Sequence, residues 1–212
     1  MQQLGVNQFT LNTSRFVLLA NTKVDSLIEE RIRAAAIFLY LSGMRIGAFV
    51  SLPLKAVDIR NRRVIQDPSL GVRTKNSKYG VTFLLNIPEL LSVVKNWDDK
   101  VRSILDDEGY WFAPFSPETC DFDVTVQEIG LHRETLARKN LYAWLTKSGL
   151  QYHSPHKFRH GHIQYGLSRS KNHADYKAVS LNVMHSNIQI TDQFYSNIPE
   201  SEVLERITAF SK

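Results

Sequence analysis

The sequence contains one cysteine, Cys120, among its 212 residues. A single cysteine allows no disulfide bond within the chain, and it excludes every zinc site that requires several cysteine ligands. Because a chain without disulfides fits a reducing compartment, we expect the protein to be cytoplasmic.

Long hydrophobic runs are missing as well. The longest, residues 34–41, has eight residues, whereas a membrane-spanning helix needs about 20. Residues 1–15 lack a basic segment followed by a long apolar stretch, so we expect no secretory signal. The sequence also lacks internal repeats, low-complexity tracts and Pro-rich or Gly/Ser-rich linkers, which favours one globular unit.

Several standard catalytic motifs are absent. The sequence has no G-x-x-x-x-G-K-[ST] or G-x-G-x-x-G loop for nucleotide phosphates, no H-E-x-x-H zinc motif and no G-x-S-x-G serine elbow. Nothing therefore supports a P-loop enzyme, a dinucleotide-binding enzyme or a serine hydrolase.

The charges are segregated along the chain, although the formal net charge is only +5. Residues 1–86 carry twelve Lys and Arg against five Asp and Glu, and residues 131–177 carry nine against two. Residues 87–130 reverse this balance, with three against ten. The two basic blocks predict a positive face that attracts a polyanion such as nucleic acid. The alternative is that they are only solvated helix faces.

The spacing of apolar residues predicts a mostly helical chain with one small antiparallel sheet inserted early, an α+β layout. We expect residues 1–24 to be a lead-in segment and residues 25–212 to form the domain. The expected helices cover residues 24–41, a short stretch after Arg45, and residues 88–105 and 131–145, then one from Pro155 and two or three more to the C-terminus. The expected strands are residues 56–59, 63–65, 72–75 and 81–85, the last two forming a hairpin around residues 76–80.

The strongest local feature is the segment Ser154-Pro155-His156-Lys157-Phe158-Arg159-His160. Serine followed by proline is a typical helix start. His156, Arg159 and His160 then share one helix face near the positive end of the helix dipole. One phosphate could contact the helix end, an imidazole and a guanidinium together. The alternative is a basic helix face with a capped start.

Three further pieces complete a pattern: Ser42-Gly43-Met44-Arg45, Arg73-Thr74-Lys75, and Met184-His185 followed by Tyr195. In this order they resemble the catalytic domain of the tyrosine recombinase (phage integrase) family. That family has an arginine in a T/S-G-x-R turn, a hairpin lysine, H-x-x-R, a second histidine and a tyrosine about ten residues later. The matching residues are separated by 30, 81, 3, 26 and 10 residues and are Arg45, Lys75, His156, Arg159, His185 and Tyr195. The resemblance runs from about residue 25 to residue 199.

The resemblance implies a site-specific DNA recombinase that acts on double-stranded DNA without ATP, metal or another cofactor. Tyr195 would attack a phosphodiester to form a 3′-phosphotyrosine, and a 5′-hydroxyl from another strand would then rejoin the DNA. The two arginines would stabilise the phosphorane, the two histidines would add hydrogen bonds, and one histidine would help to deprotonate the tyrosine. Lys75 would protonate the leaving 5′-oxygen, with Lys78 and Arg73 as rivals.

The resemblance also implies DNA contacts and assembly. We expect DNA to contact Arg73, Lys78, Lys157 and His160, and we expect the protein to assemble as a tetramer on DNA. Full-length members carry a core-binding domain that clamps the DNA, and about 24 residues before the first helix are too few to form it. An apolar stripe near the C-terminus would either cover the domain's own core or dock onto a neighbouring subunit; its residues are Val203, Leu204, Ile207 and Phe210.

Three positions depart from the family pattern. The family commonly has an acidic residue three positions after the first arginine, where this chain has Ala48. Phe158 replaces the usual leucine before the second arginine, and Met184 replaces the usual glycine before the second histidine.

Three rival functions stay open at this point. A type IB topoisomerase shares the tyrosine chemistry, and a catalytically silent DNA-binding module could keep the fold. A metal-dependent hydrolase would use His156, His160 and His162, with Asp121 and Asp123, although the helix offers no carboxylate with convincing ligand spacing.

Overall fold

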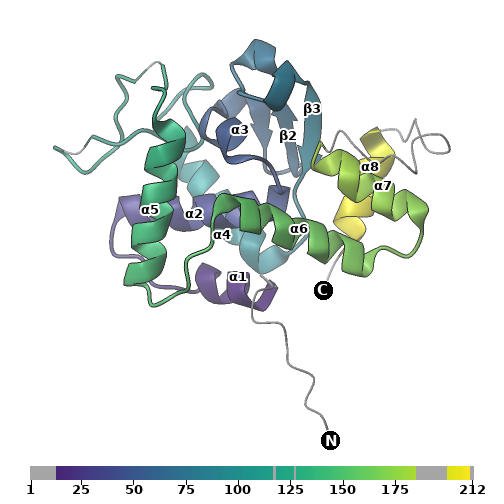
Figure 1. Cartoon of the computed structure of the whole chain (residues 1–212). Coiled ribbons are helices and arrows are strands. Elements are labelled where there is room, and N and C mark those ends of the chain that lie inside the picture. The colour runs from purple at the N-terminus through teal and green to yellow at the C-terminus, as the bar shows by residue number, and fades with distance from the viewer. Residues whose placement is uncertain (1–12, 117, 127, 185–199, 211–212) are drawn as a thin grey trace, which may run out of the picture.

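The computed structural model describes residues 13–116, 118–126, 128–184 and 200–210. A small sheet lies at one end of a largely helical body (Figure 1). The α+β prediction is therefore confirmed. No helix among the described residues has the length and hydropathy that crossing a membrane requires.

The central helix is α2, Leu27–Ser42, which packs against α1, α4, α5 and α6. Ser26 caps its start by accepting a hydrogen bond from the Glu29 amide, and every residue from Arg31 to Ser42 except Arg33 is buried. Gly43 ends the helix in a left-handed conformation with φ of 62°. The helix predicted over residues 24–41 is confirmed.

The first helix, α1, spans Thr13–Ala20 and belongs to the core. Phe16 is 1% exposed and stacks on Tyr40 of α2, with ring centroids 3.8 Å apart. The interpretation of residues 1–24 as a lead-in is therefore wrong for this helix. Two helical turns are too few for apolar spacing to stand out in the sequence.

The sheet is antiparallel with strand order β1-β2-β3, formed by Val57–Asp58, Arg63–Gln66 and Gly80–Phe83. Residues 72–75 lie in the described part of the chain and do not form the predicted strand, because β2 itself pairs with β3. The connection from residue 67 to residue 79 contains two 3-10 turns instead, Pro68–Leu70 and Lys75–Ser77. Left-handed backbone at Gly71, Asn76 and Ser77 interrupts any extended run there.

The remaining helices agree with the prediction. They are α3 (Ile46–Val50), α4 (Pro88–Arg102), α5 (Arg133–Lys147), α6 (Pro155–Arg169), α7 (His173–Asn182) and α8 (Glu200–Ala209). The described residues between α4 and α5 form a long loop, in which Phe115 and Phe122 make an isolated bridge.

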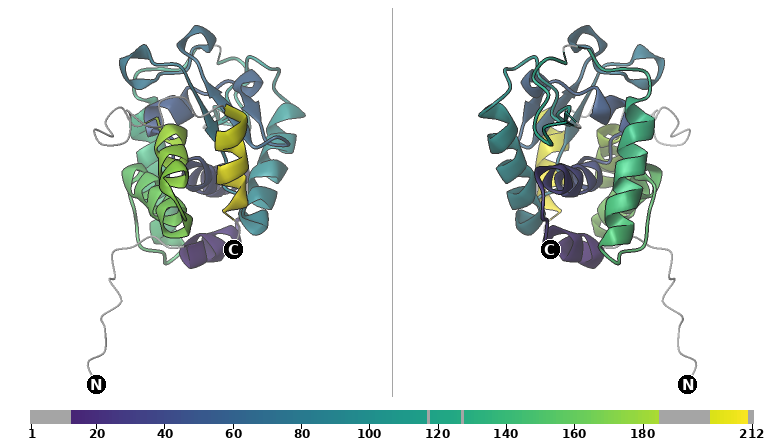
Figure 2. Two further views of the ribbon diagram at one scale, coloured as in Figure 1. Left: turned by 90° about the vertical axis from the view of Figure 1, so that its right-hand side faces the viewer. Right: turned by 90° about the vertical axis from the view of Figure 1, so that its left-hand side faces the viewer.

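The C-terminal helix α8 packs on its own chain, against α7 and β3 (Figure 2). Val203, Ile207 and Phe210 from the predicted apolar stripe are buried there. An ion pair between Arg206 and Asp175 holds α8 to α7. In this structure the stripe covers the domain's own core and is not presented to a neighbouring subunit.

Candidate active site

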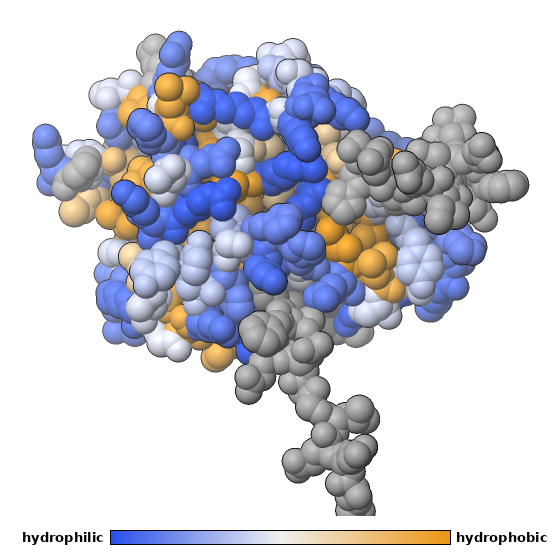
Figure 3. Space-filling model, viewed as in Figure 1, coloured by the Kyte–Doolittle hydropathy of each residue, from blue (hydrophilic) through white to orange (hydrophobic). Residues whose placement is uncertain are grey.

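A groove of about 390 Å³ lies where α3, α5, α6 and the connection between β2 and β3 meet. Six basic residues line it, namely Arg45, Arg73, Lys75, Arg138, His156 and Arg159. Hydrophilic residues gather across the middle of the face that carries α5 and α6 (Figure 3). This concentration of positive charge suits an anionic ligand.

Arg45 reaches the groove from the tight turn after α2. Gly43 makes this turn possible, because its φ is positive and a Cβ there would lie 2.6 Å from the His162 ring and 2.9 Å from Val183. Arg45 then stands half-buried at the start of α3 with an extended backbone. The turn thus brings a charged side chain from an apolar stretch of the chain to the groove.

Arg159 is almost buried, with 5% of its surface exposed. Its guanidinium donates to the Gly43 carbonyl at 2.7 Å and to the Val183 carbonyl at 2.5 Å. Burial, together with the charge of Arg45, lowers the pKa of Arg159 to about 10. Within the described part of the chain no carboxylate pairs with this arginine, so its charge is not neutralised.

The three residues considered for the general-acid role, Lys75, Lys78 and Arg73, differ in which cavities they line. Lys75 begins the second 3-10 turn and lines both the groove and an adjacent small cavity that Arg45 and Met184 also line. Lys78 lines only that cavity. Arg73 lines the groove, but its guanidinium donates to the Ile129 carbonyl at 2.9 Å.

His156 lies at the beginning of α6 and lines the groove. Its Nε2 lies 2.9 Å from the Nε2 of His160, with the two rings almost perpendicular. Such a contact needs one donor and one acceptor, so at least one ring is neutral. Burial, followed by the nearby cations, lowers the pKa of His160. His160 and Lys157 are exposed on α6.

The sequence model of the phage integrase family matches residues 12–202 of this chain. The chain belongs to the phage integrase family. Sequence comparison with curated proteins gives no significant match.

Solved structures of similar fold include three DNA recombinases. XerA recombinase is 18% identical with a TM-score of 0.57 over 96% of this chain and 64% of its own. XerH recombinase bound to difH substrate is 16% identical with a TM-score of 0.54; the match covers 92% of this chain and 51% of XerH. A lambda integrase dimer bound to a COC′ core site is 14% identical with a TM-score of 0.54; the match covers 90% of this chain and 61% of the integrase chain. The chain thus spans about half to two thirds of the length of these proteins.

Met184 stands where the family usually has glycine, and its backbone keeps a glycine-like conformation with φ of 52°. Its side chain fills the space beside Gly80 of β3, where an added Cβ would lie 2.7 Å from the Met184 sulfur. Gly80 thus leaves the room that the Met184 side chain occupies. The predicted site residues His185 and Tyr195 lie outside the described residues.

Two groove residues were not predicted as part of the site. Glu134 and Arg138 of α5 form an i,i+4 ion pair with a separation of 3.4 Å. Among the described residues that line the groove, Glu134 alone carries a carboxylate. Its Oε1 would lie 2.6 Å from a Cβ at Gly47, so the acidic group approaches α3 close to Ala48. No local pattern could have indicated this, because it depends on how α5 packs on α3.

The metal-site hypothesis is not supported by the geometry. His162 is completely buried and bonds to the Tyr40 carbonyl and to Asn182, away from the exposed His160. The described residues contain no group of three or more potential metal ligands. His156 and His160 therefore form a pair on the surface and not part of a larger cluster.

Proposed function

We propose that this chain is the catalytic part of a site-specific tyrosine recombinase that cuts and rejoins double-stranded DNA. One observation carries the proposal: Arg45, Lys75, His156 and Arg159, which come from three distant segments of the sequence, line one basic groove. Membership of the phage integrase family supports the same conclusion. The recombinases bound to DNA have the same fold.

The reaction begins with Tyr195. Its hydroxyl oxygen forms a bond to a DNA phosphorus while the bond from that phosphorus to the 5′-oxygen breaks. A histidine, His156 or His185, accepts the tyrosine proton, and Lys75 gives a proton to the 5′-oxygen. The product is a 3′-phosphotyrosine and a free 5′-hydroxyl. Attack by a 5′-hydroxyl of another strand reverses these steps, so the covalent link conserves the phosphodiester energy.

The two arginines stabilise the charge that develops on the non-bridging oxygens. Arg159 is suited to this role because the Gly43 and Val183 carbonyls fix its guanidinium and leave its charge uncompensated. Groups held in place before the reaction need no reorganisation in the transition state. DNA contacts by Arg73, Lys78, Lys157 and His160 would extend the binding surface beyond the groove, and several copies of the protein would assemble on the DNA.

The test is covalent trapping on a nicked duplex whose cleavage releases a short strand. The wild-type protein should give a covalent protein–DNA band, and Tyr195→Phe should bind the duplex without giving it. Tyr176→Phe is the matched control, because Tyr176 is an exposed tyrosine of α7 outside the groove. Loss of the band in the control but not in Tyr195→Phe would refute the assignment. Joining of strands from two duplexes would separate a recombinase from a topoisomerase.

A further inference from the structure

A buried polar pair lies directly behind the groove and has no part in the chemistry above. His162 is on α6, one turn after Arg159, and Asn182 is the last residue of α7. Neither side chain is exposed, and the His162 Nε2 lies 3.2 Å from the Asn182 Nδ2. Buried polar groups of this kind are costly unless all of them are paired.

The hydrogen-bond partners determine where the protons lie. The Tyr40 carbonyl can only accept, so the His162 Nδ1, 3.0 Å away, carries the proton. Burial lowers the pKa of His162 to about 4, so the ring is neutral and its Nε2 accepts from the Asn182 amide. The Phe83 amide donates to the Asn182 Oδ1 at 2.7 Å, and the Asn182 Nδ2 also donates to the Phe83 carbonyl at 3.0 Å.

The network ends at the two turns that hold Arg159. On one side, the Tyr40 carbonyl belongs to the last turn of α2, and the His162 ring packs on Gly43. On the other side, Asn182 precedes Val183, and the Asn182 carbonyl accepts from the Thr82 hydroxyl at 2.8 Å. The same two turns supply the Gly43 and Val183 carbonyls that anchor the guanidinium.

We propose that His162 and Asn182 are positioning residues, which fix the turn carrying Arg45, the Arg159 guanidinium and the end of α7 relative to one another. The proposal rests on the proposed function. A neutral imidazole can donate on one edge and accept on the other, so it holds α2 and α7 at one fixed separation. An apolar side chain of the same size would fill the space without fixing that separation. Small displacements of catalytic groups, on the order of 1 Å, can cost about 10²-fold in rate.

The test compares His162→Phe, Asn182→Leu and the double variant in single-turnover cleavage of the nicked duplex. Saturating protein removes effects of DNA affinity. The temperature is one at which circular dichroism shows that each variant is folded, which removes effects of stability. Each single variant should cleave roughly 10- to 100-fold more slowly with a DNA dissociation constant within about 3-fold of wild type. The double variant should resemble the singles, because both residues act through one network. His162→Gln, which can donate and accept, should recover most of the rate.

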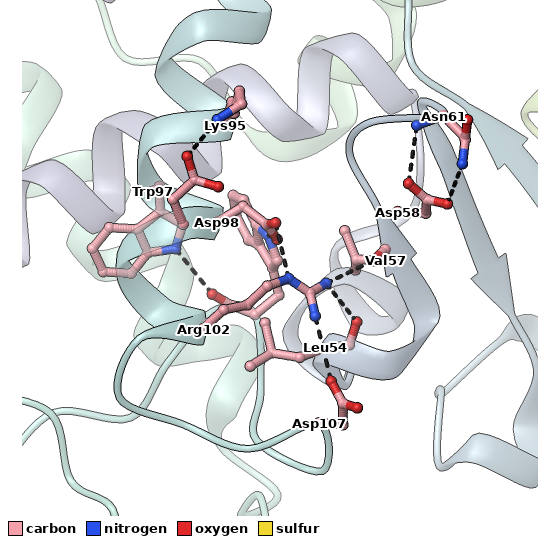
Figure 4. A network of polar contacts seen from close by, with 11 residues as sticks. Leu54, Val57, Asp58, Asn61, Lys95, Trp97, Asp98, Arg102 and Asp107 are labelled. Carbon is pink, nitrogen blue, oxygen red and sulfur yellow. Dashed lines mark hydrogen bonds and ion pairs between the residues drawn. The ribbon is translucent and has the colours of Figure 1, made fainter.

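Asp98→Asn is the matched control. Asp98 is also buried and polar: it accepts from Trp111 at 2.9 Å and from Arg102 at 2.9 Å, and Arg102 in turn donates to the Leu54 and Val57 carbonyls (Figure 4). Asp98 and Arg102 belong to α4, and none of the residues in this network lines the groove. The variant should lower the melting temperature but cleave within about 2-fold of wild type when folded.

The possible outcomes separate the two proposals. Wild-type protein that forms no covalent product refutes the proposed function and the positioning role with it. If the wild-type protein cleaves the duplex and the folded variants His162→Phe and Asn182→Leu cleave it equally fast, only the positioning role is overturned. Equal slowing in Asp98→Asn also overturns it, because the effect would then be a general consequence of a disrupted core. If His162→Phe does not fold, Asn182→Leu and His162→Gln decide between these results.

Discussion

Acid should destabilise this protein through His162. The pKa of this histidine is about 4 in the folded protein and 6.5 when it is not buried. Between these values the unfolded chain binds a proton that the folded chain does not bind. The free energy of unfolding therefore falls as the pH falls through this window, and the contribution is complete only above pH 6.5.

The magnitude follows from the two pKa values. At pH 5 the unfolded chain gains about 2 kcal/mol by protonating this histidine, and well below pH 4 the loss approaches about 3 kcal/mol. For a domain of about 150–250 residues, 1 kcal/mol corresponds to roughly 2–4 °C in melting temperature. Acidification from pH 8 to pH 5 should thus lower the melting temperature by about 4–8 °C through this one residue.

The assay is urea unfolding of wild type and His162→Gln at pH 8 and pH 5. Other groups titrate as well. We therefore compare the fall in unfolding free energy from pH 8 to pH 5 between wild type and His162→Gln. Wild type should lose about 2 kcal/mol more than the variant. His132→Gln, which removes an exposed histidine, is the control and should lose as much as wild type. Equal losses in wild type and His162→Gln would refute the reasoning.

Three further predictions follow from the groove and from α8. Arg159→Lys should reduce single-turnover cleavage by roughly 10²-fold or more with little change in DNA affinity, because an ammonium cannot keep both carbonyl anchors and bind phosphate in the same geometry. Lys75→Ala should be rescued by a substrate with sulfur at the 5′-bridging position, which leaves without an acid, whereas rescue of Lys78→Ala alone would transfer the role. Deleting residues 200–212 should cost about 5 kcal/mol or more of unfolding free energy, because three buried apolar side chains are lost; an unchanged melting temperature would contradict the packing of α8.

The parts of the fold that local chemistry determines were predictable. Gly43 ends α2 because the left-handed conformation suits glycine, and Ser154-Pro155 starts α6 because proline fits the first helical turn. Strand pairing was less predictable, since residues 81–85 could pair with residues 72–75 or with β2 on apolar pattern alone. In the structure β3 pairs with β2 along its whole length, an outcome that depends on the tertiary structure.

The candidate site shows the same division. Four of the predicted catalytic residues line one groove, because each occupies a turn or helix end whose local sequence is distinctive. The grouping of His162 with His156 and His160 was wrong, and the spacing explains why. His162 follows His160 by two positions, which places it on almost the opposite side of a helix with 3.6 residues per turn. Glu134 entered the groove only through the packing of α5 on α3, which no local pattern encodes.

The anchoring of Arg159 explains how the groove can stay strongly positive before DNA binds. A carboxylate partner would neutralise the guanidinium, whereas two carbonyl oxygens satisfy its N–H groups and leave the full charge. With a pKa of about 10 the side chain still keeps its proton at neutral pH, despite burial and the repulsion from Arg45. In the proposed reaction, a phosphate bound between the two arginines would offset that repulsion. Binding energy would thereby be directed to the position where the phosphorane gains its extra negative charge.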